Sequence, residues 1–190
     1  MSEWEELKAS CLDCRKCGLA ETRTNVVFGM GNPQAEVLLV GEGPGQSEDE
    51  QGLPFVGRSG KLLDVYLDTI DLSREKNVFI ANIVKCRPPG NRDPQPEERQ
   101  ACLPWLRTQF KLLKPKVVVC LGRIAAQVII REDFKVMSEH GQFTEKNGTW
   151  FMGTLHPAAL LRNPRQKPLA FDDFVALRQK IREVCTHTYP

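Results

Sequence analysis

The sequence predicts an α/β fold, a three-layer α/β/α sandwich around a central, mostly parallel sheet of about four strands. Short apolar runs rich in β-branched residues recur along the chain, and each is flanked by turn residues, as buried strands are. Longer segments with helical periodicity separate these runs. Strands that alternate with helices pair in parallel through right-handed crossovers, so helices are expected on both faces of the sheet.

The expected strands, in chain order, are residues 37–40, 78–84, 117–121 and 150–154. Two of the expected helices have clear signals. Apolar side chains recur through residues 60–70 with the 3.6-residue period of one helix face. Residues 96–113 open with proline and two glutamates, which is typical of a helix start. Helical patterns are also present in residues 123–131 and 170–184.

The length and composition are those of one domain over residues 1–190, with enough apolar side chains for a core. The net charge of +2 is nearly balanced, so contact with nucleic acid must come from local basic segments such as 85–92 and 162–167. No apolar run is long enough to span a membrane, and the acidic N-terminal residues lack an apolar signal region. We expect an intracellular, cytoplasmic monomer with no membrane partner.

Seven cysteines are many for a chain expected in a reducing compartment, where metal ligation is more common than disulfides. Cys11, Cys14 and Cys17 form two overlapping C-x-x-C pairs, and Cys86 and Cys102 lie far along the chain. Four thiolates from two distant segments would close one tetrahedral zinc site or one iron–sulfur cubane. The spacing leaves both metals open, and it leaves open which pair of the first segment is used.

Parallel sheets bind ligands beyond the carboxyl ends of their strands. The loop after the first strand, 41–45, reads Gly-Glu-Gly-Pro-Gly and forms a tight turn that lets a ligand approach the backbone. It matches neither a P-loop nor a dinucleotide fingerprint, and the acidic residues 46–51 argue against a bound polyphosphate. Phe55 follows this loop and is either a core residue or a stacking platform for a planar base.

The other two loops contribute an amide and an imidazole. Asn82 interrupts an apolar strand and must be hydrogen-bonded, either as a structural tie or by a bound group such as the N3–H and O4 edge of uracil. His156 stands at an expected strand end before a proline, where a neutral imidazole could donate to a developing anion. Leu160 or Leu161, if exposed on this loop, could wedge into a base stack.

These segments together resemble the uracil-DNA glycosylase superfamily, and most closely its family-four, iron–sulfur members. The motifs that carry the resemblance are GEGPG at 41–45, LPFVGRSG at 53–60, ANIVKCRPP at 81–89 and HPAALLRNP at 156–164. The resemblance implies a DNA repair enzyme that flips uracil out of single- or double-stranded DNA and hydrolyses its N-glycosidic bond. The products would be free uracil and an abasic site, as in base excision repair.

The resemblance also implies a role for individual residues. Phe55 would stack on uracil, Asn82 would hydrogen-bond to its edge, and His156 would stabilise charge at O2. Glu42 would position water, with Glu48 as a second supporting acid. Gly41 and Gly43 would also bind uracil. The residues expected to contact DNA are Ser59, Arg162 and Leu160, the last as the intercalating residue. The expected ligands of a [4Fe–4S] cluster are Cys14, Cys17, Cys86 and Cys102, and Cys11 would not be a ligand.

An alternative remains within the same fold, a non-catalytic or covalently trapping uracil-DNA-binding protein. A trapping cousin of this superfamily carries GEQPG and a basic KRRIH insertion. The present sequence has Gly43 in that motif and no such insertion, which favours turnover over trapping. The expected location is the cytoplasm, with association to the nucleoid if the source is a prokaryote.

Overall fold

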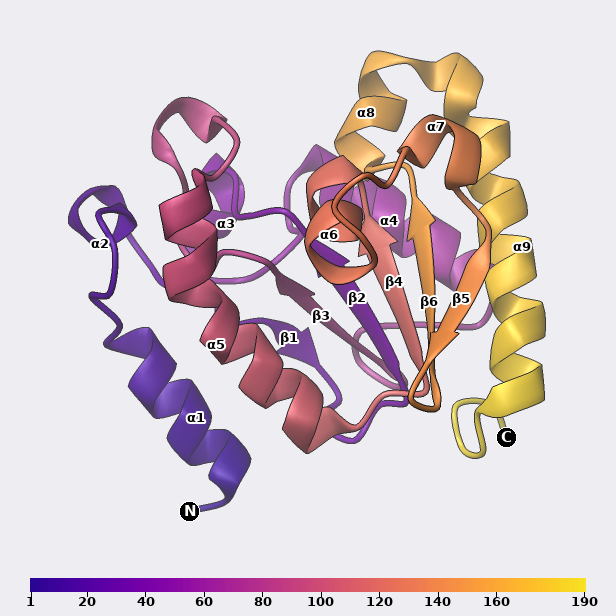
Figure 1. Cartoon of the computed structure of the whole chain (residues 1–190), viewed down its shortest axis with the longest axis horizontal. Helices are drawn as coiled ribbons and strands as arrows, with labels where there is room; N and C mark the ends of the chain where they lie inside the picture. Colours follow the sequence, from indigo (N-terminus) through magenta and orange to yellow (C-terminus); the bar gives the residue numbers. More distant parts are fainter.

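The computed structural model of the chain describes residues 1–190, in which one sheet lies between two layers of helices (Figure 1). The strands are β1 (Met30–Gly31), β2 (Val37–Gly41), β3 (Val78–Asn82), β4 (Val117–Leu121), β5 (Phe143–Lys146) and β6 (Thr149–Thr154). Their order across the sheet is β1-β3-β2-β4-β6-β5. The pairs β3–β2, β2–β4 and β4–β6 are parallel, which confirms the expected α/β class.

The sheet has six strands, so the expected number of about four is too low. The two additional strands, β1 and β5, pair antiparallel at opposite edges. β1 has only two residues, too few for any alternation of polar and apolar side chains. β5 is mostly exposed, and its Asn147–Gly148 connection to β6 has positive φ at both residues, the signature of a tight hairpin. That dipeptide is the sequence signal for β5.

Nine α-helices and two short 3₁₀ turns connect the strands. The α-helices are α1 (Glu3–Leu12), α2 (Leu19–Thr22), α3 (Gln46–Gln51), α4 (Arg58–Thr69), α5 (Pro96–Leu113), α6 (Arg123–Ile129), α7 (Val136–Glu139), α8 (Pro157–Arg162) and α9 (Lys167–Val184), and the 3₁₀ turns are Pro89–Asn91 and Pro164–Gln166. α5 has the expected bounds, and α4, α6 and α9 lie where helical patterns were expected. The acidic segment after the glycine-rich turn folds as α3.

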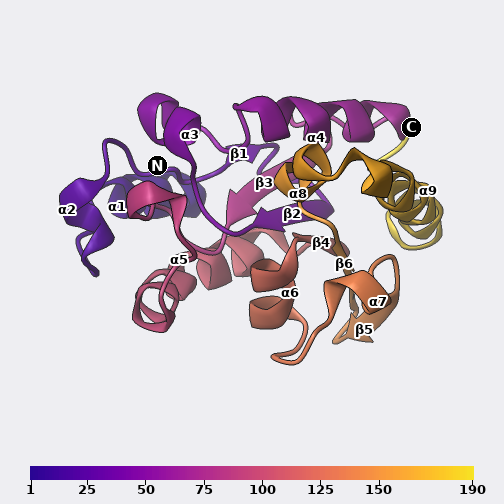
Figure 2. The same ribbon diagram turned by 90° about the horizontal axis from the view of Figure 1, so that it is seen from above.

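Two apolar cores lie on opposite faces of the sheet. α4, α8 and α9 cover one face and α1, α5 and α6 cover the other, as Figure 2 shows from above. Neighbouring residues of β2 divide between them, with Leu38 and Val40 in one core and Val37 and Leu39 in the other. Every residue of β2, β3 and β4 is buried, as parallel strands covered on both faces are. No helix is both long and apolar enough to cross a membrane.

The N-terminal helix α1 lies along α5 (Figure 1), although its sequence has little helical amphipathicity. A capping box between Ser2 and Glu5 defines its start. Trp4 anchors it, because its ring packs edge-on against Phe79 of β3 with centroids 4.9 Å apart and against Phe28 at 5.5 Å. Aromatic packing from distant residues therefore fixes this helix in place.

The C-terminal residues 186–188 are tied to the base of β2 by one buried carboxylate. Glu36 is 5% exposed and accepts hydrogen bonds from the amides of Thr186 and His187 and from the hydroxyls of Thr186 and Thr188. Burial opposes its charge, but these four hydrogen bonds prevail and lower the pKa of Glu36 to about 2. The ionised carboxylate is therefore part of the folded structure.

We expect Glu36→Gln to lower the free energy of unfolding at pH 7 by about 3 kcal/mol, the linkage value of this pKa depression. A carboxyl whose pKa is depressed contributes fully above its unfolded pKa, near 4.5, and loses that contribution as the pH falls through about 2. Urea unfolding at a series of pH values measures the difference, which should shrink below pH 4.5. Exposed Glu75 supplies the control Glu75→Gln, and equal effects of both changes would contradict the assignment.

Candidate functional site

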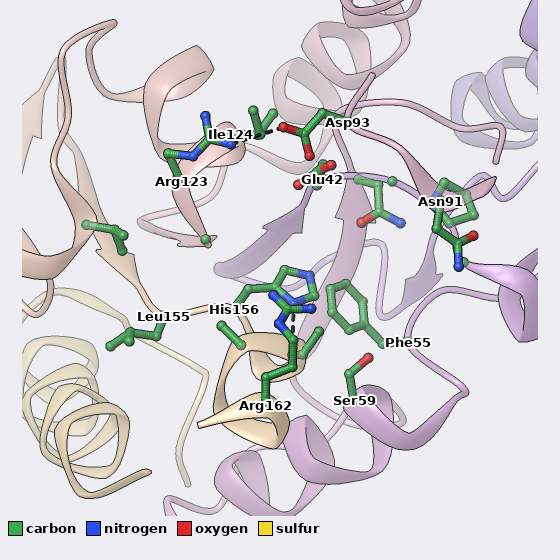
Figure 3. A pocket seen from close by; sticks show the side chains of 18 of the residues that line it. Glu42, Phe55, Ser59, Asn91, Asp93, Arg123, Ile124, Leu155, His156 and Arg162 are labelled. Atoms are coloured by element: carbon green, nitrogen blue, oxygen red, sulfur yellow. Dashed lines mark hydrogen bonds and ion pairs between the residues drawn. The ribbon is translucent and has the colours of Figure 1, made fainter. Parts of the chain in front are cut away.

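A pocket of about 560 Å³ opens at the carboxyl ends of the parallel strands, the position expected from the sheet topology. Its volume is in the range of small-molecule sites. Phe55, Asn82 and His156, which come from the loop after α3, the end of β3 and the loop after β6, all line it. Figure 3 shows Phe55 and His156 side by side in this pocket. The sequence-based expectation that these three side chains converge on one pocket is confirmed.

The aromatic side of the pocket depends on a glycine. The rings of Phe55 and His156 lie with centroids 5.6 Å apart and planes inclined by 31°. A Cβ at Gly41 would lie 2.5 Å from the Phe55 ring and 2.5 Å from Asn82 Oδ1. Gly41 and Asn82 are also register partners in β2 and β3. Any larger side chain at Gly41 would push apart the ring and the amide, so this expected site residue acts through its lack of a side chain.

Asn82 lines the pocket and has an unpaired buried polar atom. Its side chain belongs to a residue only 2% exposed, and its Oδ1 atom accepts no hydrogen bond from the protein. A buried amide without a partner is costly, and native structures keep one only where something else completes it. The side-chain oxygen of Asn82 therefore makes no structural hydrogen bond within the protein.

His156 caps α8 and is held in one tautomer. Its Nδ1 accepts a hydrogen bond from the amide of Ala158 at 3.0 Å. Burial, and then the positive charge of Arg162, lower the pKa of His156 to about 4, against the opposing effect of Glu48. The ring is therefore neutral at pH 7, and because Nδ1 is an acceptor, the proton resides on Nε2. A neutral imidazole with a fixed N–H can donate one hydrogen bond into the pocket.

Glu42 stands on the opposite wall of the pocket, beside Asp93 (Figure 3). Burial and the neighbouring Asp93 carboxyl raise the pKa of Glu42 to about 7, although the guanidinium groups of Arg123 and Arg99 oppose the shift. Asp93 itself is ion-paired with Arg123 at 3.0 Å. The pocket thus contains a carboxyl group that takes up or releases a proton near neutral pH.

Sequence reasoning missed Asp93 and Arg123 as pocket residues. Asp93 directly follows the basic segment 85–92, which was interpreted as either a solvated loop or a DNA-contact loop. Arg123 begins α6, immediately after β4, the strand end for which no site residue was expected. Ligand sites lie beyond the carboxyl ends of all the parallel strands, including β4, so this rule could have indicated Arg123 as a pocket residue.

Glu48 lies deeper and holds a loop. Its Oε1 accepts hydrogen bonds from the amides of Val56 and Gly57, at 3.2 and 3.1 Å. The carboxylate is 8% exposed and still lines the pocket. Glu48 therefore fixes the segment that follows Phe55, which places it beside the site as a support for the aromatic wall.

The expected DNA-contact residues divide in two groups. Ser59 and Arg162 line the pocket, and Arg162 is exposed. Leu160 is different, because it is 1% exposed and belongs to the core that α8 forms with α4. The expectation of an exposed intercalating Leu160 is wrong, since the α8 helix turns this side chain toward the core. Leu161, the alternative named from sequence, remains partly exposed.

The four expected cysteine ligands line one small cavity. Cys14 and Cys17 come from the segment after α1, Cys86 follows β3, and Cys102 lies in α5. Cys11 is buried nearby but does not line this cavity. No three His, Cys, Asp or Glu side chains anywhere in the chain converge closely enough to hold a single metal ion. A tetrahedral zinc site needs every sulfur about 2.3 Å from one point, whereas a cubane holds its thiolates farther apart.

Three of these four sulfurs accept N–H hydrogen bonds. Trp105 Nε1 donates to Cys14 at 3.2 Å, Arg23 Nη1 to Cys86 at 3.4 Å, and the amide of Lys85 to Cys102 at 3.2 Å. Hydrogen bonds of this kind stabilise ligating thiolates and tune the metal they bind. Four thiols with N–H donors around them fit a metal centre held by cysteine ligands.

The fold and the pocket together define an α/β protein whose pocket, at the carboxyl ends of the parallel strands, is lined by an aromatic ring, an amide and an imidazole. The family model of the uracil DNA glycosylase superfamily matches residues 28–181. The chain therefore belongs to the uracil-DNA glycosylase superfamily, and several of the curated proteins similar to it carry a more specific name.

Three of these relatives are named type-4 uracil-DNA glycosylases. The one from Archaeoglobus fulgidus is 41% identical and aligns over 100% of this chain and 97% of its own length. The one from Sulfurisphaera tokodaii is 40% identical over 94% of this chain and 85% of its own. The one from Thermotoga maritima is 44% identical over 79% of each chain. The family-four resemblance found in the motifs is confirmed by these matches.

We expect a ¹³C NMR titration of the glutamate carboxyls to assign to Glu42 a pKa of about 7. Asp93→Asn removes a neighbouring negative charge and should lower this pKa, whereas Arg123→Gln removes a positive charge and should raise it. Glu42→Gln identifies the resonance by its disappearance. Shifts of the same sign in the two neighbouring variants would show that the Asp93 and Arg123 charges do not control the Glu42 carboxyl.

Proposed function

We propose that this protein excises uracil from DNA by hydrolysing its N-glycosidic bond, which leaves free uracil and an abasic site for base excision repair. The observation that carries the proposal is the unpartnered side-chain oxygen of Asn82, buried at the end of β3 in the pocket that Phe55 and His156 also line. The names of the type-4 relatives support the same activity.

Recognition of uracil requires that the base leave the duplex, because its edge and glycosidic bond are shielded there. Phe55 would stack on the flipped base, a contact worth about 1–3 kcal/mol. The carboxamide of Asn82 offers an acceptor for N3–H and a donor for O4. Cytosine presents the opposite pattern at these two positions, so the amide would favour uracil through hydrogen-bond complementarity.

Bond cleavage would leave negative charge on the departing uracil and positive charge on the sugar, in analogy with glycoside hydrolysis. His156 is neutral and carries its proton on Nε2, so it would stabilise the charge at O2 by donating a hydrogen bond. Gly41 and Gly43 allow the backbone of the turn to approach the base, since a Cβ at Gly43 would lie 2.7 Å from the Val84 side chain.

Glu42 is the acidic residue that would act on the sugar of the flipped nucleotide. In its ionised form it would orient the attacking water and stabilise the cationic sugar. Because its pKa is raised to about 7, activity should fall as the pH drops below neutrality and the carboxylate becomes protonated. Glu48 would support the site indirectly, by holding the amides of residues 56 and 57.

DNA would lie across the rim of this pocket, in single- or double-stranded form. Ser59 and exposed Arg162 are placed to contact its phosphates. Leu161 takes the wedge role for which buried Leu160 is unsuited. We place the protein in the cytoplasm, in association with the nucleoid in a prokaryote, as a monomer formed by a single domain over residues 1–190.

The cysteine cavity would hold a [4Fe–4S] cluster through Cys14, Cys17, Cys86 and Cys102, with Cys11 outside the ligand set. The cluster would cross-link the segment after α1 to α5 and to the loop after β3. It needs no redox change for this role. Zinc remains the alternative, and the lack of a single-ion arrangement of donors counts against it.

Base release from matched oligonucleotides tests the proposed activity. We expect free uracil and abasic sites from uracil-containing DNA, and none from matched cytosine-containing DNA. Asn82→Asp should lower the rate on uracil roughly a hundredfold, since it alters a buried hydrogen-bonding pair. Asn147→Asp makes the same chemical change at an exposed residue of the β5–β6 turn, outside the pocket, and should stay within about twofold of the original rate.

Two other outcomes of this assay would reject the proposal. A stable protein–DNA adduct without free uracil would indicate the covalently trapping alternative. Full activity and selectivity in Asn82→Asp would remove that amide from uracil recognition.

Metal analysis tests the cluster. Protein purified without oxygen should contain about four irons per chain and absorb visible light as iron–sulfur proteins do. Cys17→Ser should lose iron and expose the segment after α1 to proteolysis, whereas Cys185→Ser, which changes a cysteine outside the cavity, should retain both. A colourless protein with one zinc per chain and full activity would contradict the proposal.

A further inference from the structure

The backbone of Phe55 is held in an unusual conformation. Its φ is +50°, in the left-handed region that bulky side chains seldom adopt. Such conformations persist only where surrounding contacts enforce them, and they concentrate at functional sites. The contacts that enforce the left-handed conformation of Phe55 are made to the carbonyl groups of this segment.

Arg74, in the loop between α4 and β3, binds two successive carbonyl oxygens at this point. Its Nη1 donates to the carbonyl of Pro54 at 2.7 Å and its Nη2 to the carbonyl of Phe55 at 2.8 Å. The Arg74 side chain is 10% exposed. A planar guanidinium with two donors in fixed geometry determines the orientation of both peptide groups.

The first turn of α4 completes the enclosure. Gly60 packs directly on the carbonyl of Phe55, where any Cβ would overlap that group. Asp64, one turn further along α4, orients the guanidinium by accepting from Arg74 Nε at 3.1 Å and from Nη2 at 2.9 Å. The Asp64 side chain is half exposed, so its ion pair with Arg74 adds orientation more than stability.

Arg74 does not line the pocket, so it would not touch a bound base. The Phe55 ring extends to the other side, against Gly41 and His156. A change at Arg74 can therefore reach the pocket only by altering the backbone, and with it the ring, of Phe55.

We propose that Arg74 is a positioning residue for base stacking, which fixes the left-handed backbone of Phe55 through the carbonyls of Pro54 and Phe55. This inference rests on the proposed function, because it assigns to Phe55 the stacking contact with uracil.

Inhibition by free uracil and steady-state kinetics test the role of Arg74. Arg74→Gln should weaken inhibition by uracil and raise KM about tenfold, in the range of one lost stacking contact, with a smaller change in kcat. Arg74→Lys retains a donor for one carbonyl and should give an intermediate effect. Arg107→Gln makes the same chemical change at an exposed arginine of α5 that does not line the pocket, and it serves as the matched control, with values within about twofold of the unmodified protein.

A double-mutant cycle with Phe55→Leu shows whether the effect passes through the ring. If Arg74 acts by placing Phe55, Arg74→Gln should not weaken uracil inhibition further once the ring is gone. Additive effects, or an Arg107→Gln effect as large as that of Arg74→Gln, would overturn the proposal. If Arg74→Gln does not fold, the same cycle is measured with Arg74→Lys.

The experiments distinguish an error in the proposed function from an error in the role of Arg74. An unmodified protein that neither binds free uracil nor releases it from DNA would contradict the assigned activity itself. Normal uracil release together with an additive cycle would contradict only the role of Arg74.

Discussion

The parallel pairing of β2 with β3 and β4, and of β4 with β6, governs the arrangement of everything at the site. This register places Gly41 beside Asn82 and Leu121 beside Thr154, so four strands end along one edge of the sheet. Each of the loops that follow these strands contributes part of the pocket wall. A slip of one residue between β2 and β3 would separate Gly41 from the amide it accommodates and turn the buried side chains of β3 to the wrong core.

The two chemical centres of the chain are physically connected through Lys85. Its backbone amide donates to the sulfur of Cys102, and its fully buried Nζ donates to the carbonyl of Asn82 at 3.2 Å and to Gln109 at 2.6 Å. Gln109 in turn donates to the carbonyl of Phe28. The cysteine cavity and the end of β3 are therefore parts of one hydrogen-bonded unit between the sheet and α5. Ordering of the cysteine segment and placement of the pocket amide are expected to depend on each other.

Sequence patterns were sufficient for the central elements because those elements are buried on both faces or carry strong end signals. The bounds of β4 and α5 agree with the expected ones. The strand expected over residues 78–84 was too long, because Ile83 and Val84 are as apolar as the strand itself, yet their amides donate to the carbonyls of Gly41 and Glu42. The edge strands were missed because an exposed or two-residue strand leaves almost no hydrophobic pattern.

The sequence by itself determined the α/β class, the strand ends that carry the site, and the presence there of Phe55, Asn82 and His156, since periodicity and position relative to strands are local properties. Only the tertiary structure decided that Leu160 faces the core, that Asp93 stands beside Glu42, and that Asn82 Oδ1 has no partner in the protein. The direction of a side chain, the charge around a carboxyl and the pairing of a buried amide depend on residues distant in sequence. These features are fixed only when the elements pack.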